Sequence, residues 1–118
     1  MVAAVNEVRA QHGLPALAGS TTLHQSARRY AEWMLRADYF GHLSRIRASS
    51  RFSMLGETLA WHSGHRPRVA STVRRWLKSP PHRAVILSGK FRYAGAGTRA
   101  DRFRGRRTRT WVMHFGAR

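Results

Sequence analysis

The sequence predicts an α+β domain, because helical periodicity fills its first two thirds and strand-like alternation appears only near its end. The chain has 118 residues, an ordinary size for one domain and long enough to bury a core. Hydrophobic residues make up 42% of it, and four Trp, five Phe and three Tyr supply large side chains for that core. We therefore expect one domain over residues 1–118.

Four helices are predicted, each from an apolar stripe or from residues typical of helix ends. Residues 2–12 come first and are followed by Gly13 and Pro15. The second helix has the clearest stripe and ends at Gly41; its apolar positions are Leu23, Ala27, Tyr30, Ala31 and Met34. The third begins near Pro67 and carries Val69, Val73, Trp76 and Leu77. Ser79 is the expected N-cap of the fourth, with Pro80 at its first position and Gly89 at its close.

The period changes to two in the last part of the chain. Tyr93–Thr98 and Thr110–Phe115 are predicted strands. In the second of them, Trp111, Met113 and Phe115 are expected on one face and Thr110, Val112 and His114 on the other. His114 is interpreted as a core histidine whose hydrogen bonds are satisfied. Residues 43–55 are polar and Arg-rich, and predict a loop or a short irregular helix anchored by Phe52 and Leu55.

Composition narrows the possible functions. The chain has no cysteine, which excludes disulfides and thiolate zinc sites, and its apolar stretches are too short to span a bilayer. The net charge is +17, and all but Lys78 and Lys90 of the 22 basic residues are Arg. An anionic partner explains this charge, and so does a proteome that uses Arg as its default surface residue. Met1-Val2 runs straight into the first helical pattern, as expected for a chain whose export signal has been removed, although the lack of cysteine permits a cytosolic location equally.

Three short phrases contain the residues with the greatest chemical interest. His42 ends Tyr39-Phe40-Gly41-His42 and, taken alone, is typical of a helix cap or surface position. Glu57 stands in the mostly apolar stretch 54–61, so its acid is expected to be partly buried and to need a partner. His82 falls in the first turn of the fourth predicted helix, whose positive end disfavours an imidazolium. A neutral His82 is suited to accept a hydrogen bond or to bind a metal.

The chain has five short motifs in a fixed order: Tyr39–His42, Gly56–Ala60, Trp76–Arg83, Arg92–Gly97 and Trp111–Gly116. Together these motifs resemble the cysteine-free bacterial branch of the CAP superfamily. That superfamily includes cysteine-rich secretory proteins, antigen 5 proteins and plant pathogenesis-related class 1 proteins. The resemblance implies a three-layer α-β-α sandwich around a small three-stranded antiparallel sheet, whose third strand we place near Gly56–Trp61. It also implies a secreted, extracellular monomer that binds a small molecule, a lipid or an acidic cell-wall polymer.

The resemblance further implies a cleft in which two His and two Glu meet. His42, Glu57 and His82 match three of these four positions, although Thr58 replaces the Asn that follows the Glu in the family. The second family Glu lies three residues after a Trp, where this chain has Ser79. Two His and one Glu form a ligand set for zinc or another divalent cation, with water as the fourth ligand. Two alternatives stay open: Glu57 bridges two imidazoles without metal, or the same cleft hydrolyses a substrate with the help of a metal.

A dense basic segment joins the two C-terminal strands. It holds six arginines around Phe103, namely Arg99, Arg102, Arg104, Arg106, Arg107 and Arg109. A solvated loop is one interpretation. The other is an anion-binding tip that docks to phosphates or acidic polymers, with Phe103 stacking or inserting. No pattern typical of sequence-specific nucleic-acid recognition is present.

Overall fold

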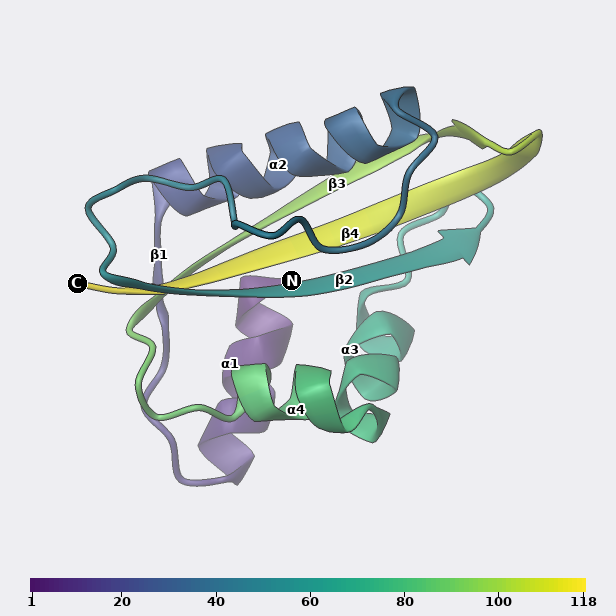
Figure 1. Cartoon of the computed structure of the whole chain (residues 1–118). Coiled ribbons are helices and arrows are strands. Elements are labelled where there is room, and N and C mark those ends of the chain that lie inside the picture. Colours follow the sequence, from purple (N-terminus) through teal and green to yellow (C-terminus); the bar gives the residue numbers. More distant parts are fainter.

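The computed structural model describes all residues, 1–118, and shows a sheet between two helical layers (Figure 1). Helix α2 covers one face of the sheet, and α1, α3 and α4 lie on the other face. In chain order the elements are α1 Val2–Gln11, β1 Ala18–Gly19, α2 Thr21–Arg36, β2 Met54–Ser63, α3 Val69–Lys78, α4 Pro80–Ile86, β3 Tyr93–Phe103 and β4 Arg106–Ala117. The α+β class and the four helices are therefore confirmed.

The prediction of a three-stranded antiparallel sheet is wrong. The sheet has four strands in the order β1-β3-β4-β2, and β1 pairs with β3 in parallel. Because β1 has only two residues, it carries no alternating pattern that the sequence could reveal. The other three strands are antiparallel, and β2 includes the expected Gly56–Trp61 segment.

The long hairpin of β3 and β4 also differs from the prediction. The strands continue to Phe103 and restart at Arg106, so only Arg104 and Gly105 form the turn. Both have positive φ angles, 53° and 79°, as a type I′ hairpin turn requires. The basic segment is thus mostly paired strand, and the expected solvated loop is reduced to two residues.

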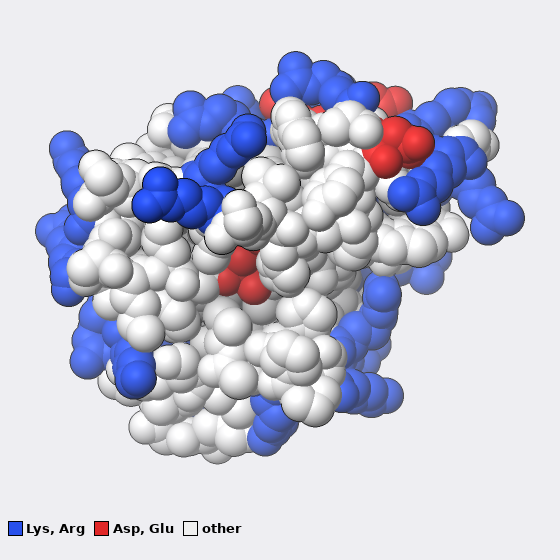
Figure 2. All heavy atoms as spheres, in the orientation of Figure 1, with Lys and Arg blue, Asp and Glu red and all other residues white.

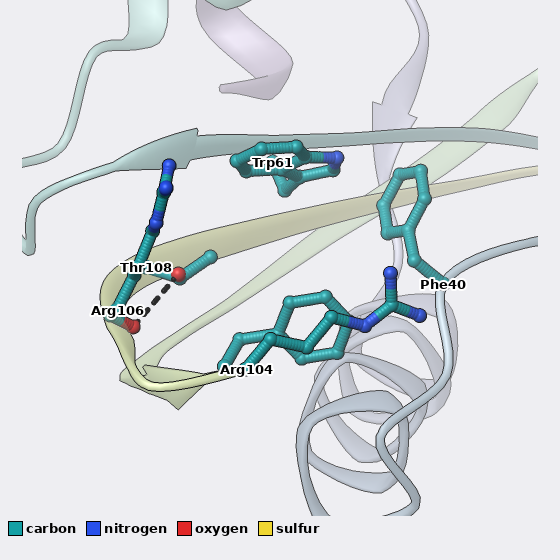
Figure 3. A pocket seen from close by; sticks show the side chains of 6 residues that line it. Phe40, Trp61, Arg104, Arg106 and Thr108 are labelled. Atoms are coloured by element: carbon teal, nitrogen blue, oxygen red, sulfur yellow. Dashed lines mark hydrogen bonds between the residues drawn. The ribbon is translucent and has the colours of Figure 1, made fainter.

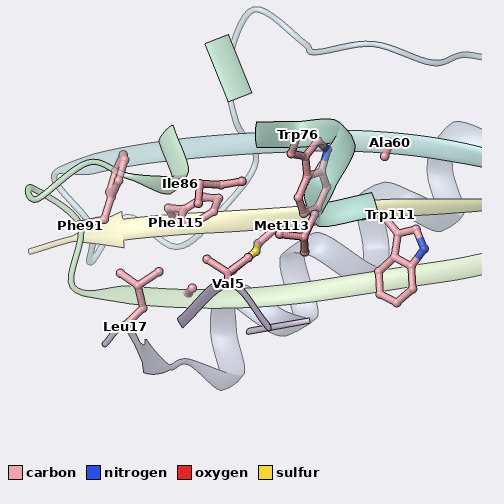
Figure 4. Close-up of a cluster of buried hydrophobic side chains, with 11 residues drawn as sticks. Val5, Leu17, Ala60, Trp76, Ile86, Phe91, Trp111, Met113 and Phe115 are labelled. Carbon is pink, nitrogen blue, oxygen red and sulfur yellow. The ribbon is translucent and has the colours of Figure 1, made fainter. Parts of the chain in front are cut away.

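Two apolar clusters hold the layers together. The larger lies between the sheet and α1, α3 and α4, and contains Val5, Trp76, Ile86, Met113 and Phe115 among its buried members (Figure 4). The smaller joins α2 to the other face of the sheet through Ala27, Tyr30, Ala31, Met34, Leu59 and Val112. The alternation predicted for β4 is therefore confirmed, because Met113 and Phe115 belong to one cluster and Val112 to the other.

Glycines on β3 let α2 approach the sheet closely. A Cβ on Gly95 or Gly97 would overlap the backbone of His24 or Arg28. Neither glycine has a φ angle that requires it, so close approach is the reason for the residue type. The glycines of β3 thus allow α2 to pack closely on the sheet, so that side chains of α2 reach β4.

A buried arginine fixes the position of α4. Arg9 of α1 is fully buried, and its Nη1 donates to the carbonyl oxygens of Ile86 and Ser88, each at 2.8 Å. These bonds satisfy carbonyl groups at the end of α4 that no helical N–H can reach. Burial lowers the pKa of Arg9 from its usual value, with a smaller contribution from Arg92. The side chain thus joins α1 to the short helix that carries His82.

Candidate functional site

The candidate site lies beside β2, which forms an edge of the sheet. Glu57 is on β2 directly opposite His114 of β4. His42 comes from the segment that follows α2, and His82 is the third residue of α4 in the opposite helical layer. The outer side of β2 is partly covered by α3, because Trp76 and Arg75 donate to the carbonyl oxygens of Leu59 and Trp61 at 2.8 and 2.9 Å.

Glu57 accepts one hydrogen bond on each carboxylate oxygen. His42 Nδ1 lies 2.7 Å from Oε1, and His114 Nε2 lies 2.7 Å from Oε2. An ionised carboxylate cannot donate, so both imidazoles donate to it. Glu57 is only 7% exposed, and these two bonds supply the partners that a buried acid needs.

The hydrogen bonds continue behind the carboxylate into the core. His114 is fully buried, and its Nδ1 lies 2.7 Å from the hydroxyl oxygen of Ser26 on α2. A neutral His114 that donates from Nε2 has a lone pair on Nδ1, so the Ser26 hydroxyl donates to it. The four side chains Ser26, His114, Glu57 and His42 form a continuous chain from the core to the surface, which we call the imidazole cluster.

His42 is the solvent-facing end of this cluster, and its side chain is 52% exposed. Because Nδ1 donates to Glu57, Nε2 of the neutral ring has a free lone pair. Two tyrosines hold the backbone around it: Tyr30 donates to the Gly41 carbonyl, and Tyr39 donates to the His42 carbonyl at 3.0 Å. Burial, followed by the nearby Glu57 carboxylate, raises the pKa of Tyr30 to about 12. Tyr30 therefore stays protonated and keeps donating into the alkaline range, above pH 10.

His82 is half-buried and lies near His42. Its pKa is lowered from the usual 6.5, first by burial and then by the charge of His42. The direction agrees with the neutral His82 expected from the sequence, but the dominant cause is desolvation and not the end of the helix. No hydrogen bond to the His82 ring is present. Its ring nitrogens thus have no hydrogen-bond partner in the protein.

The geometry refines the ligand set inferred from the sequence. Glu57 bridges two imidazoles, but they belong to His42 and His114 and not to His42 and His82. No group of three or more His, Cys, Asp or Glu side chains has an arrangement that could hold a metal. Sequence reasoning treated His114 as a satisfied core residue and did not connect it to Glu57. The alternation of β4 contained part of this information. When β2 and β4 are paired in the observed register, Glu57 and His114 lie opposite each other on one face of the sheet.

The six arginines of the hairpin have different surroundings. Arg99 and Arg104 form ion pairs with Asp101 and Asp38 at 3.9 and 3.4 Å. Arg109 donates to the His65 carbonyl and the Thr98 hydroxyl at 2.7 and 2.9 Å, so it supports the hairpin. Arg102 reaches only the Gly105 carbonyl at 3.3 Å, and no ion pair involves Arg102, Arg106 or Arg107. Figure 2 shows basic side chains at the hairpin end of the molecule, and others around the rest of its outline.

Residues 2–115 match the family model of the cysteine-rich secretory protein family, CAP. The chain belongs to the CAP family. The match covers nearly the whole domain, and the absence of cysteine puts the chain among members without disulfides.

Solved structures agree with this assignment. An outer surface protein from Borrelia burgdorferi superposes with a TM-score of 0.80 at 20% identity, covering 99% of this chain and 89% of that one. An extracellular protein with an SCP domain from Bacillus anthracis gives a TM-score of 0.73 at 25% identity, covering 97% of this chain and 38% of that one. Both share the fold, and both are named as outer-surface or extracellular proteins.

A curated relative is longer than this domain. The uncharacterized membrane protein YlbC of Bacillus subtilis is 28% identical over 101 residues, which is 78% of this chain and 28% of YlbC. The chain therefore spans little more than a quarter of the length of that relative. No helix in the present structure combines the length and apolar character needed to cross a bilayer.

Proposed function

We propose that this protein is a secreted, extracellular CAP binding module without turnover, in which His42 and His82 take a divalent cation or a small polar ligand. The observation that carries the proposal is the 2.7 Å hydrogen bond from His42 Nδ1 to Glu57. It fixes one tautomer and leaves Nε2 of His42 as a free electron-pair donor. A metal-binding His usually donates its other ring N–H to a carboxylate, a backbone carbonyl or water, and the bond from His42 to Glu57 is of this kind.

The donor set suits a zinc-like ion held by imidazole nitrogens and water, with Glu57 outside the coordination sphere. Both oxygens of Glu57 already accept hydrogen bonds, so the carboxylate orients His42 and does not itself act as a ligand. His82 adds a second neutral imidazole. Two protein ligands give weaker binding than the three or four of established zinc sites. We therefore expect modest affinity.

Calorimetric titration with zinc tests this proposal. His42→Ala and His82→Ala should each abolish binding. Glu57→Gln should weaken it by about 10–100-fold, because a single amide oxygen without charge cannot accept from both His42 and His114. Binding should also fall below about pH 6, where protons compete for imidazoles with a reference pKa of about 6.5. His65→Ala is the matched control, since its ring lies in an exposed turn. Equal zinc binding by the wild type and both His variants would overturn the metal site.

A metal-dependent hydrolase using the same residues is the second candidate. An imidazole oriented by a carboxylate, as His42 is by Glu57, is a suitable general base. No second carboxylate accompanies His42, because this chain has Ser79 at the position of the second family Glu. No activated nucleophile accompanies it either, because Ser26 is buried and its hydroxyl is hydrogen-bonded to His114. Ester hydrolysis that depends on zinc and disappears in His42→Ala would favour this candidate over a binding module.

A secreted location agrees with the outer-surface and extracellular names of the two structural relatives. Expression of the complete gene in its host, followed by fractionation, would test it. Recovery of the protein in the cytosolic fraction alone would contradict the proposed location without affecting the proposed site.

A further inference from the structure

A second candidate site lies at the tip of the β3–β4 hairpin and shares no residue with the imidazole cluster. It is a groove of about 450 Å³ between the hairpin, the end of β2 and the segment after α2 (Figure 3). Small-molecule sites commonly have about 300–1,000 Å³. Its lining residues are Phe40, Trp61, Phe103, Arg104, Arg106 and Thr108.

The groove is positively charged. Its lining includes two arginines and no carboxylate. Arg104 is paired with Asp38 at 3.4 Å, and both of these side chains are mostly exposed, so water screens the pair. Arg106 has no ion pair. An anion in the groove would therefore meet one uncompensated guanidinium and one that is only weakly neutralised.

Trp61 is the most exposed aromatic ring of the groove. Trp61 is 41% exposed, the largest exposed fraction among the large hydrophobic residues of the chain. Phe103 is 8% exposed, and the Arg104 guanidinium lies over its ring at 4.8 Å from the centroid. Phe40 packs against the apolar cluster under α2. Trp61 is thus the main stacking surface of the groove, and a ligand with one ring suits it.

One arginine of the groove, Arg104, lies in the hairpin turn. Arg104 has a φ angle of 53°, a conformation that costs most non-glycine residues about 1–2 kcal/mol. At this position of a type I′ turn Asn, Asp or Gly is usual. The Arg104 guanidinium lies over the Phe103 ring, and both residues line the groove.

We propose that this groove binds a small anion whose negative group is attached to a single sugar or base ring. The ring stacks on Trp61, and the phosphate or carboxylate accepts hydrogen bonds from Arg106 with Arg104 beside it. A nucleoside monophosphate and an acidic monosaccharide both have this chemistry. The proposal is independent of ligand binding at His42 and His82.

Titration calorimetry with UMP and with glucuronate, each against its neutral counterpart uridine or glucose, tests the proposal. The wild type should bind at least one anion and neither neutral compound. The anion that binds more tightly identifies the source. Arg106→Gln should weaken binding about tenfold, as expected for loss of a charge-assisted hydrogen bond. Trp61→Ala should weaken it about fivefold or more through loss of stacking.

Arg74→Gln is the matched control, because it removes the same charge from an exposed position on α3. It should bind like the wild type, and all variants should keep the wild-type circular dichroism, since Trp61 and Arg106 are exposed. Three outcomes would each overturn the proposal: no binding of either anion, equal binding of anions and neutral compounds, or an equal loss in Arg74→Gln and Arg106→Gln.

Discussion

Charged side chains have partners within the fold in the imidazole cluster, but one of them has none in the hairpin groove. In the cluster, the only buried carboxylate, Glu57, has a donor on each oxygen, and its partner His114 is in turn bonded to Ser26. In the groove, Arg106 has no carboxylate partner, and it follows the strained turn of Arg104 and Gly105 in a lining that includes the exposed Trp61. Buried charge must be compensated within the fold, whereas exposed charge is solvated by water until a ligand arrives. Changes in the cluster should therefore affect stability, and changes in the groove should affect binding.

Gly95→Ala should have the largest effect, because it disturbs the support of the cluster. A Cβ on Gly95 would overlap the His24 backbone and push α2, which carries Ser26 and Tyr30, away from the sheet. We expect a loss of more than about 3 kcal/mol in the free energy of unfolding, measured by urea denaturation. Gly19→Ala is the control, since its Cβ would enter open space. Similar stability of the two variants would mean that α2 is not held by this contact.

The stability of Glu57→Ala, set beside that of Arg106→Gln, compares the cluster with the groove directly. The Glu57→Ala substitution leaves the buried Nε2–H of His114 without an acceptor and creates a cavity, so we expect a loss of about 2–3 kcal/mol. Arg106→Gln, on the exposed hairpin, should change stability by less than about 0.5 kcal/mol. Chemical denaturation of both variants at pH 7 provides the measurement. A larger loss of unfolding free energy for Arg106→Gln than for Glu57→Ala would show that the exposed groove contributes more to stability than the buried cluster.

Tyr30 makes the cluster sensitive to alkaline pH. Its pKa is raised from 10.0 to about 12 in the folded protein, so the folded state retains a proton that the unfolded state has lost. This stabilisation is complete below pH 10 and disappears as the pH rises towards 12. Between these limits the wild type should lose about 2–3 kcal/mol more than Tyr30→Phe. Parallel unfolding slopes for the two proteins over this range would show that Tyr30 titrates normally.

Thr58→Val should give the smallest effect, and one of opposite sign. Thr58 neighbours Glu57 on β2 but faces the other side of the sheet, and its buried hydroxyl has no hydrogen-bond partner. Valine has a similar shape without the unsatisfied group, so thermal unfolding should show a gain of about 0.5–1 kcal/mol. Thr58→Ser, which keeps the hydroxyl, should show no gain. A loss of stability in Thr58→Val would mean that the hydroxyl has a partner such as water.

Local sequence patterns determined the helices, the faces of β4 and the burial of Glu57. The stripe of Leu23, Ala27, Tyr30, Ala31 and Met34 appears in the structure as the buried face of α2, because a periodicity of 3.6 residues depends only on backbone geometry. Family resemblance added His42 and His82, which no periodicity connects. In both cases the information lies in residues that are adjacent or regularly spaced along the chain.

Tertiary structure alone decided which partners these residues have. Whether Glu57 meets His82 or His114 depends on the register between β2 and β4, and one residue of slip would turn His114 to the other face. The parallel pairing of β1, the burial of Arg9 against α4 and the groove between Phe40, Trp61 and the hairpin tip have the same origin. Each joins segments that are distant in sequence, and their mutual placement is set by the sum of many long-range contacts that no short pattern encodes.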